Sequence, residues 1–267
     1  MGIYLNPNND RFKQALNSEI YVDKSGLISV TNKRLRTEQK YICVSRPRRF
    51  GKSMNLGMLA AYYSRGCESK ELFDNLAIAK DTSYHQHINQ YNVIYINMQE
   101  FLSESSTKEM EDVVALLKKR LWRDFRRLNM ELDPDDSLSF WAKEVYYETG
   151  IPFVILIDEW DCVMREHRNN KDALKTYLDF LRSWLKDQDY VALAYMTGIL
   201  PIKKYGTHSA LNMFREYSML NSAEYTKYSN YSVTLRNPQF LHKVEKWEGS
   251  EKNQRNVNIQ EAKKVVN

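Results

Sequence analysis

Residues 41–53 bring together a glycine, a lysine and a hydroxyl in an order that suits the binding of phosphate. An apolar run over residues 41–44 leads into a turn that ends in Gly51, Lys52 and Ser53. These three residues form the second half of the pattern G-x-x-x-x-G-K-[ST], in which Arg46 replaces the first glycine. Glycine lets the backbone approach an anionic oxygen, lysine reaches the β- and γ-phosphates, and the hydroxyl coordinates Mg²⁺. The pattern predicts a nucleoside triphosphate site, and the alternative is a basic surface turn.

The segments on either side of this turn fit a phosphate loop. Residues 41–44 have the composition of a strand, and residues 52–64 that of a mostly apolar helix, whose positive end can hold an anion. The residues that we expect to contact the nucleotide are Pro47, Arg48, Arg49, Phe50, Gly51, Lys52, Ser53 and Met54. We expect at least one arginine of the loop to contact phosphate; a patch that faces nucleic acid and a solvated basic loop are the alternatives.

An acidic cluster follows a second apolar run. Residues 153–157 are all apolar, which is typical of a strand buried on both faces of a parallel sheet. Asp158 would then lie at the carboxyl end of the strand, where open α/β sheets bind ligands. This arrangement resembles a Walker B element, in which Asp158 holds Mg²⁺ through water and Glu159 deprotonates the attacking water. The alternative is that both acids cap the next helix, and we expect Asp161 to orient this segment.

A polar residue ends a third apolar run. Residues 190–196 are mostly apolar, and Thr197 and Gly198 follow them. Thr197 is therefore a candidate sensor of the γ-phosphate, with a simple turn at the end of a strand as the alternative.

These motifs together resemble the AAA-ATPase-like family of bacterial proteins. The resemblance rests on residues 21–25, 45–53, 158–161, 197–199 and 210–214, and it extends over about residues 1–220. It implies a P-loop NTPase fold of the additional-strand type, with a strand between the Walker A and Walker B strands, and it implies ATP and Mg²⁺. Arginine commonly replaces the first glycine of the loop in this family. Members usually continue with a helical lid and a PD-(D/E)XK nuclease-type domain.

The C-terminal part departs from that pattern. Residues 221–267 are polar and contain no acidic-lysine nuclease motif. We therefore predict a P-loop domain over residues 1–220 and, over residues 221–267, a polar extension that is the remnant of a truncated lid.

The remaining segments predict an α/β fold with a doubly wound, mostly parallel sheet and helices on both faces. The predicted strands are 41–44, 91–97, 153–157 and 191–197, and the predicted helices are 52–64, 106–129, 138–149 and 171–187. Ser137 can cap the helix at 138. Residues 68–79 read as a short helix with a strand-like exit, and residues 1–40 as a polar segment with a turn at 6–10.

Composition limits the possible partners. The chain has 39 basic and 34 acidic residues, and its net charge of +5 permits a nucleic-acid partner without requiring one. Three scattered cysteines suit neither a disulfide framework nor a zinc site, and no apolar run is long enough to cross a membrane. We expect a cytoplasmic chain. The helix predicted at 106–129 carries Lys118, Lys119, Arg120, Arg123, Arg126 and Arg127. We expect this to be a solvated face, with a DNA-binding surface as the alternative.

Two functional hypotheses result. The first is an ATPase in which Lys52 and Ser53 bind the phosphates and Mg²⁺, Asp158 holds the metal and Glu159 activates water. The second is a nucleotide-binding module that does not hydrolyse ATP, or a remnant of a longer ATPase-nuclease protein. Nucleic-acid binding regulated by nucleotide is a third, weaker hypothesis.

Overall fold

The strands form one parallel sheet with the phosphate-loop strand near its edge. The computed structural model describes residues 2–217 except Ile20, Arg49, Ser106, Lys108 and residues 203–210. The strands are β1 (Tyr41–Ser45), β2 (Asn92–Asn97), β3 (Phe153–Asp158), β4 (Val191–Gly198) and β5 (Arg215–Tyr217). In the described part of the chain their order is β2-β3-β4-β1-β5, and every pair is parallel. Strand β4 lies between β1 and β3, which confirms the predicted additional-strand arrangement.

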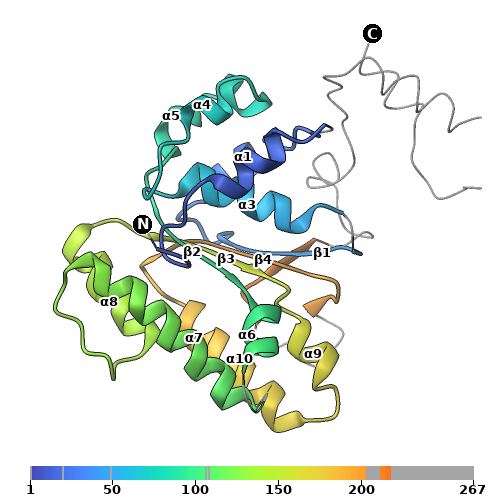
Figure 1. The fold of residues 1–267 in the computed structure, drawn as a ribbon, viewed down its shortest axis with the longest axis vertical. Coiled ribbons are helices and arrows are strands. Elements are labelled where there is room, and N and C mark those ends of the chain that lie inside the picture. Colours follow the sequence, from blue (N-terminus) through green and yellow to red (C-terminus); the bar gives the residue numbers. More distant parts are fainter. Residues whose placement is uncertain are drawn as a thin grey trace, which may run out of the picture.

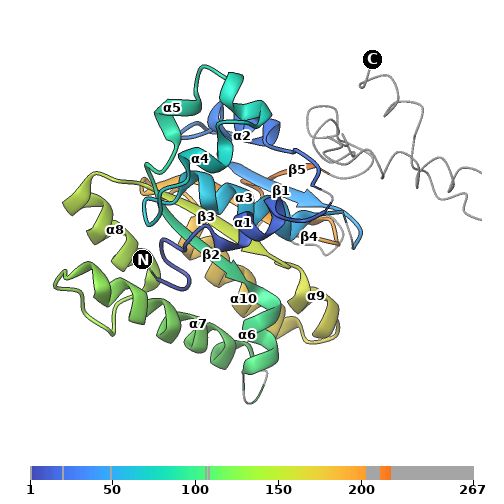
Figure 2. The same cartoon turned by 45° about the horizontal axis from the view of Figure 1, so that its top comes forward.

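Helices cover both faces of this sheet (Figure 1). One face carries α1 (Asp10–Leu16), α2 (Gly26–Asn32), α3 (Lys52–Tyr63), α4 (Lys70–Phe73), the 3-10 helix η1 (Ala77–Lys80) and α5 (Tyr84–His87). The other carries α6 (Met98–Glu104), α7 (Met110–Phe125), η2 (Arg126–Leu128), α8 (Leu138–Thr149), α9 (Cys162–Glu166) and α10 (Lys171–Leu185). Figure 2 shows the same division from a second direction. The predicted doubly wound α/β fold is therefore confirmed.

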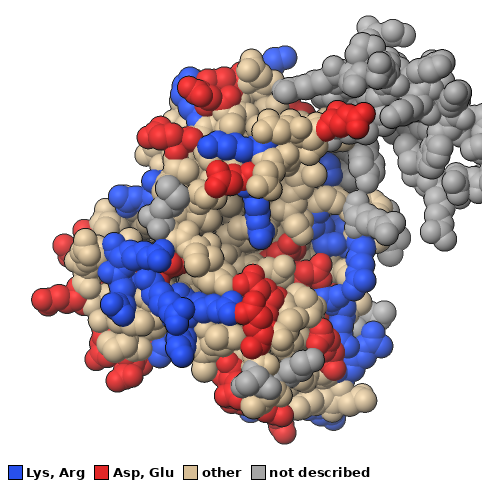
Figure 3. Space-filling model, in the orientation of Figure 1, with Lys and Arg blue, Asp and Glu red and all other residues tan. Residues whose placement is uncertain are grey.

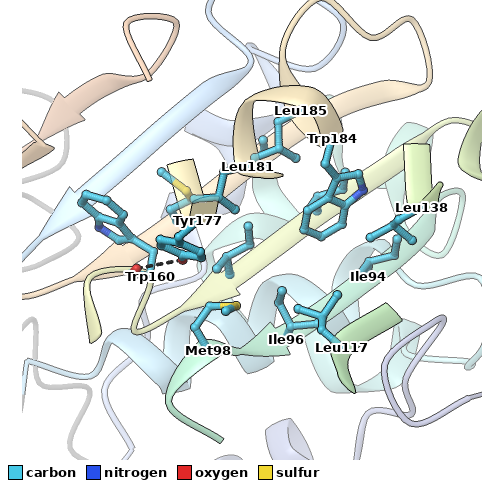
Figure 4. Close-up of a cluster of buried hydrophobic side chains, with 14 of the residues drawn as sticks. Ile94, Ile96, Met98, Leu117, Leu138, Trp160, Tyr177, Leu181, Trp184 and Leu185 are labelled. Carbon is cyan, nitrogen blue, oxygen red and sulfur yellow. Dashed lines mark hydrogen bonds between the residues drawn. The ribbon is translucent and has the colours of Figure 1, made fainter. Parts of the chain in front are cut away.

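Alternating side chains of the strands fill the two cores. On β2, Ile94 and Ile96 face the helices α6–α10, whereas Val93 and Tyr95 face α1–α5. In the first core, Trp160 lies beside Tyr177 of α10, and the Tyr177 hydroxyl donates a hydrogen bond of 2.8 Å to the Trp160 carbonyl (Figure 4). This bond fastens the segment after β3 to a helix that is itself buried on one side.

Local signals identified most of the long elements. Helix α8 begins and ends as predicted, and the Ser137 hydroxyl accepts a hydrogen bond from the Phe140 N–H at 3.2 Å. The predicted helix 106–129 begins later, at Met110, and its apolar stripe lies in the core. The strand-like exit predicted within residues 68–79 was wrong, because η1 occupies that place. The predicted extension over residues 221–267 lies outside the described residues.

No helix among the described residues has both the length and the apolar composition needed to cross a bilayer.

Candidate nucleotide site

The loop between β1 and α3 depends on one left-handed glycine. Gly51 has φ +72° and immediately precedes the first residue of α3, and its carbonyl accepts the Asn55 N–H at 2.9 Å. A Cβ at this position would lie 3.0 Å from the amino nitrogen of Lys24, so the backbone conformation and the space both favour glycine. The same Lys24 ammonium donates to the Phe50 carbonyl at 3.2 Å. The N-terminal segment therefore braces the loop.

Lys52 folds over its own loop. Its side-chain nitrogen donates to the carbonyls of Arg46 and Pro47, each at 3.0 Å, and the residue is 8% exposed. Burial lowers the pKa of the Lys52 ammonium from its ordinary value, and nearby carboxylates, Glu159 first among them, oppose this shift. The acidic cluster is therefore close enough to influence the charge of the loop lysine.

The start of the loop is attached to the end of β4. The Arg46 N–H donates to the Gly198 carbonyl at 3.0 Å, and the Ser45 hydroxyl donates to the Leu200 carbonyl at 3.1 Å. Arg46, which stands where the usual pattern has glycine, is 2% exposed. Pro47, Arg48, Ser53 and Met54 are exposed, Phe50 is half-buried, and Arg49 lies outside the described residues.

Asp158 and Thr197 meet at the carboxyl edge of the sheet. Each is 1% exposed, and the Thr197 hydroxyl donates to Asp158 Oδ1 at 2.5 Å. The Glu159 N–H donates to the same oxygen at 3.0 Å. Thr197 is also the register partner of Val44 on β1, one residue before the loop begins. The structure thus brings Lys52, Asp158 and Thr197 to one edge of the sheet, where three neighbouring strands end.

The guanidinium of Arg165 lies between the carboxylates of Glu159 and Asp161. The sequence analysis did not predict this contact. Glu159 has φ +51°, and its Oε2 accepts a hydrogen bond from Arg165 at 2.5 Å. Arg165 Nε lies 3.6 Å from Asp161 Oδ2. Asp161 is fully buried, and the same oxygen accepts the backbone N–H groups of Ile199 and Leu200 at 3.1 and 2.8 Å. Asp161 therefore holds the turn after β4, and its expected part in orienting the segment after β3 stays a prediction.

Gly198 completes the contact between the two strand ends. A Cβ on this residue would lie 2.6 Å from Asp161 Oδ1 and 2.7 Å from Trp160 Nε1. Only glycine therefore allows the segments after β3 and β4 to approach this closely.

Two functional side chains gave little signal in the sequence. Lys24 lies in the element 21–25 on which the family resemblance partly rests, but nothing in its spacing indicates a contact with the loop. Arg165 lies one helical turn after Asp161, so the pair could have been proposed as an i,i+4 ion pair. The contact between Arg165 and Glu159 involves a left-handed backbone at Glu159. Nothing in the sequence predicts that conformation.

A family model described as "Predicted AAA-ATPase" matches residues 10–207. The match includes the loop, the acidic cluster and Thr197. No curated protein matches the chain.

Proposed function

The chain belongs to the AAA-ATPase-like family, which implies nucleotide binding, and we propose that it binds ATP with Mg²⁺ and hydrolyses the γ-phosphate. The observation that carries the proposal is the meeting of Lys52, Asp158 and Thr197 at one carboxyl edge, with β4 between the two motif strands. Sheets of this kind bind their ligands at that edge.

In this proposal the loop wraps the polyphosphate. Backbone N–H groups of residues 50–54 and the N-terminal end of α3 face the phosphate oxygens. Lys52 gives up the carbonyls of Arg46 and Pro47 and donates to the β- and γ-phosphates instead. The exposure of Ser53 and Met54 leaves this end of the helix open to a ligand.

The available donors suit Mg²⁺. The Ser53 hydroxyl and the Asp158 carboxylate are oxygen donors, and both hydrogen bonds that Asp158 accepts within the described residues fall on Oδ1. Within these residues no group of three or more His, Cys, Asp or Glu side chains could hold a metal by itself. Mg²⁺ needs no such cage, because it keeps several waters and takes the remaining ligands from phosphate. When bound, it would neutralise charge that develops on the β- and γ-oxygens.

The chemical step assigns one role to each remaining side chain. Glu159 accepts a proton from water, whose oxygen attacks the γ-phosphorus while the bond to the β–γ bridging oxygen breaks. Lys52 stabilises charge on the transferred group, and the Thr197 hydroxyl turns from Asp158 Oδ1 to donate to a γ-phosphate oxygen. The products are ADP and inorganic phosphate.

A titration combined with turnover tests this proposal. We expect ATP with Mg²⁺ to raise the melting temperature of the full chain, because a ligand at 100 times its Kd stabilises by about 2.7 kcal/mol. ADP and GTP, with and without Mg²⁺, define the preference for the base and the metal. E159Q should keep this shift and lose ATP hydrolysis, whereas E148Q, at an exposed position on α8, should retain both. Binding without turnover by the unmodified chain would favour the non-hydrolysing module, and unchanged turnover in E159Q would refute the assignment of the base.

One surface favours a second candidate function, the binding of nucleic acid. Lys119, Arg123, Arg126 and Arg127 are exposed along α7 and η2. Asp124, the acid among them, is 3% exposed and accepts the backbone N–H groups of Tyr4 and Leu5. Lysine and arginine side chains gather over the α7–α8 side of the molecule (Figure 3).

Salt dependence tests this second candidate. Duplex DNA and single-stranded RNA should bind at low salt and dissociate as salt rises, and the double variant R123E/R126E should bind more weakly. No binding at low salt would remove this candidate and leave the ATPase proposal intact.

A further inference from the structure

Arg165 lies between the two carboxylates that follow β3. It comes from α9, and its side chain is 17% exposed. One terminal nitrogen donates to Glu159 Oε2 at 2.5 Å and approaches Gln99 Oε1 at 3.5 Å, while Nε lies 3.6 Å from Asp161 Oδ2. A planar guanidinium can hold several acceptors in a fixed geometry, which an ammonium group cannot do.

The Asp161 end of this contact is fixed by backbone hydrogen bonds. Asp161 is fully buried and accepts two backbone N–H groups from the turn at 199–200. That turn follows Thr197, and the Gly198 carbonyl accepts the N–H of Arg46 in the phosphate loop. A side chain held against Asp161 is therefore held relative to both Thr197 and the loop.

The Glu159 end of this contact is held by Arg165. The Glu159 side chain is 23% exposed, and within the described residues its carboxylate accepts a hydrogen bond from Arg165. The Glu159 N–H donates to Asp158 Oδ1, which also accepts the Thr197 hydroxyl, and the next residue, Trp160, donates its N–H to the Thr197 carbonyl at 3.1 Å. Glu159 therefore lies at the end of β4, where the Gly198 carbonyl accepts the N–H of Arg46 in the loop. Its position beside the loop thus depends on the guanidinium.

We propose that Arg165 is a positioning residue that holds the Glu159 carboxylate beside the phosphate loop and couples it through Asp161 to the turn after Thr197. This inference rests on the proposed function, in which Glu159 accepts the proton of the attacking water. Small displacements of a reacting group can reduce turnover about 100-fold. Arg165 should therefore affect the hydrolytic step much more than the affinity for nucleotide.

The test compares two Arg165 variants with one control in the full chain. R165A should lower kcat for ATP about 10- to 100-fold, whereas its Kd for a non-hydrolysable ATP analogue should change less than about threefold, well under 1.4 kcal/mol. R165K keeps the positive charge and a similar volume, so it should fold and recover part of kcat. R168A removes an exposed arginine close by and should behave as the unmodified chain.

A double variant asks whether Arg165 acts through Glu159. In E159Q/R165A the residual turnover, measured over long incubation, should match that of E159Q alone, because effects of residues that act as a unit are not additive. An equal further loss would show that Arg165 acts independently and would overturn the inference. So would normal turnover in R165A, or a loss of analogue binding as large as the loss of kcat. An unmodified chain that binds ATP without turnover would instead overturn the proposed hydrolysis itself.

Discussion

The loop after β1 and the segment after β3 supply the two halves of the candidate site, and different contacts hold them. In the loop, Lys52 donates hydrogen bonds to carbonyls of the same loop, and Arg48 and Ser53 are exposed. After β3, Asp158 and Asp161 are at most 1% exposed and accept hydrogen bonds from the end of β4. The acidic half is thus assembled by the fold, whereas the loop half would have to exchange contacts to bind phosphate as proposed.

This contrast separates two kinds of effect. Changes in the loop should act mainly on nucleotide affinity, because its side-chain contacts are those that a ligand replaces. Changes after β3 should act mainly on stability and turnover. Removing a buried acceptor there leaves its donors without a hydrogen bond, and buried polar groups without a partner are costly. Matched substitutions on the two sides test whether nucleotide affinity and stability respond separately.

The largest expected effect is on the loop side. K52A removes the cation that the proposal brings to the β- and γ-phosphates, and charge-assisted hydrogen bonds contribute about 3 kcal/mol at most each. ATP affinity should therefore fall more than about 100-fold. The free energy of unfolding without nucleotide should fall by about 1 kcal/mol, because the carbonyls of Arg46 and Pro47 lose a donor. Calorimetric titration measures the first quantity and urea denaturation the second. K70A, on an exposed i,i+4 ion pair with Asp74, serves as the control; equal ATP binding by K52A and K70A would contradict the prediction.

The matching change on the acidic side is D161A. It leaves the N–H groups of Ile199 and Leu200 without their acceptor and Arg165 without one carboxylate. Losing a buried charged partner of this kind costs about 3 kcal/mol, so the free energy of unfolding should fall by about that amount. The affinity of the folded protein for ATP should change less than in K52A. D179A, at an exposed position on α10, should be near neutral. If D161A and D179A have equal free energies of unfolding, the contacts of Asp161 do not hold the acidic half of the site together.

A smaller effect is expected where the two neighbouring strands touch. T197V keeps the shape of the side chain but removes the donor to Asp158 Oδ1. A hydrogen bond to a charged group contributes about 1.5 kcal/mol, so urea denaturation should show a loss of that size together with slower ATP turnover. T197S retains the hydroxyl and should recover most of both. If T197S loses stability and T197V does not, packing of the methyl group and not the hydrogen bond holds this contact.

The sequence predicted the parts of the molecule that depend on local pattern. Strand β3 is a continuous apolar run, and α8 has a capping serine, so each could be located without knowledge of its neighbours. Helices α1 and α2 were missed because each is only seven residues long, too short for a clear helical period, with Phe12, Leu27 and Ile28 among the buried residues. Their burial depends on packing against α3 and its neighbours.

Strand β5 and the two cationic contacts were missed for a related reason. β5 is three residues long and exists by pairing with the edge of β1. Lys24 reaches Phe50 across a large sequence separation, and Arg165 reaches Glu159 because Glu159 is left-handed. Motifs identify which side chains meet a ligand, whereas the side chains that hold those residues in place become visible through tertiary contacts.

The smallest effect separates backbone strain from loop function. Gly51 and Gly150 both have left-handed backbones, with φ +72° and +68°, but a Cβ on Gly51 meets Lys24 at 3.0 Å whereas one on Gly150 meets nothing within 4 Å. Alanine in this conformation costs about 1 kcal/mol, so G51A and G150A should each lose about that much stability. Only G51A should also weaken ATP binding, because it displaces Lys24 and reshapes the turn that presents the N–H groups to phosphate. Urea denaturation and calorimetric titration of both variants measure the two quantities. Equal ATP affinity in G51A and G150A would mean that the loop adapts to its ligand without a fixed turn. The loop half would then be less ordered before binding, relative to the acidic half, than its contacts indicate.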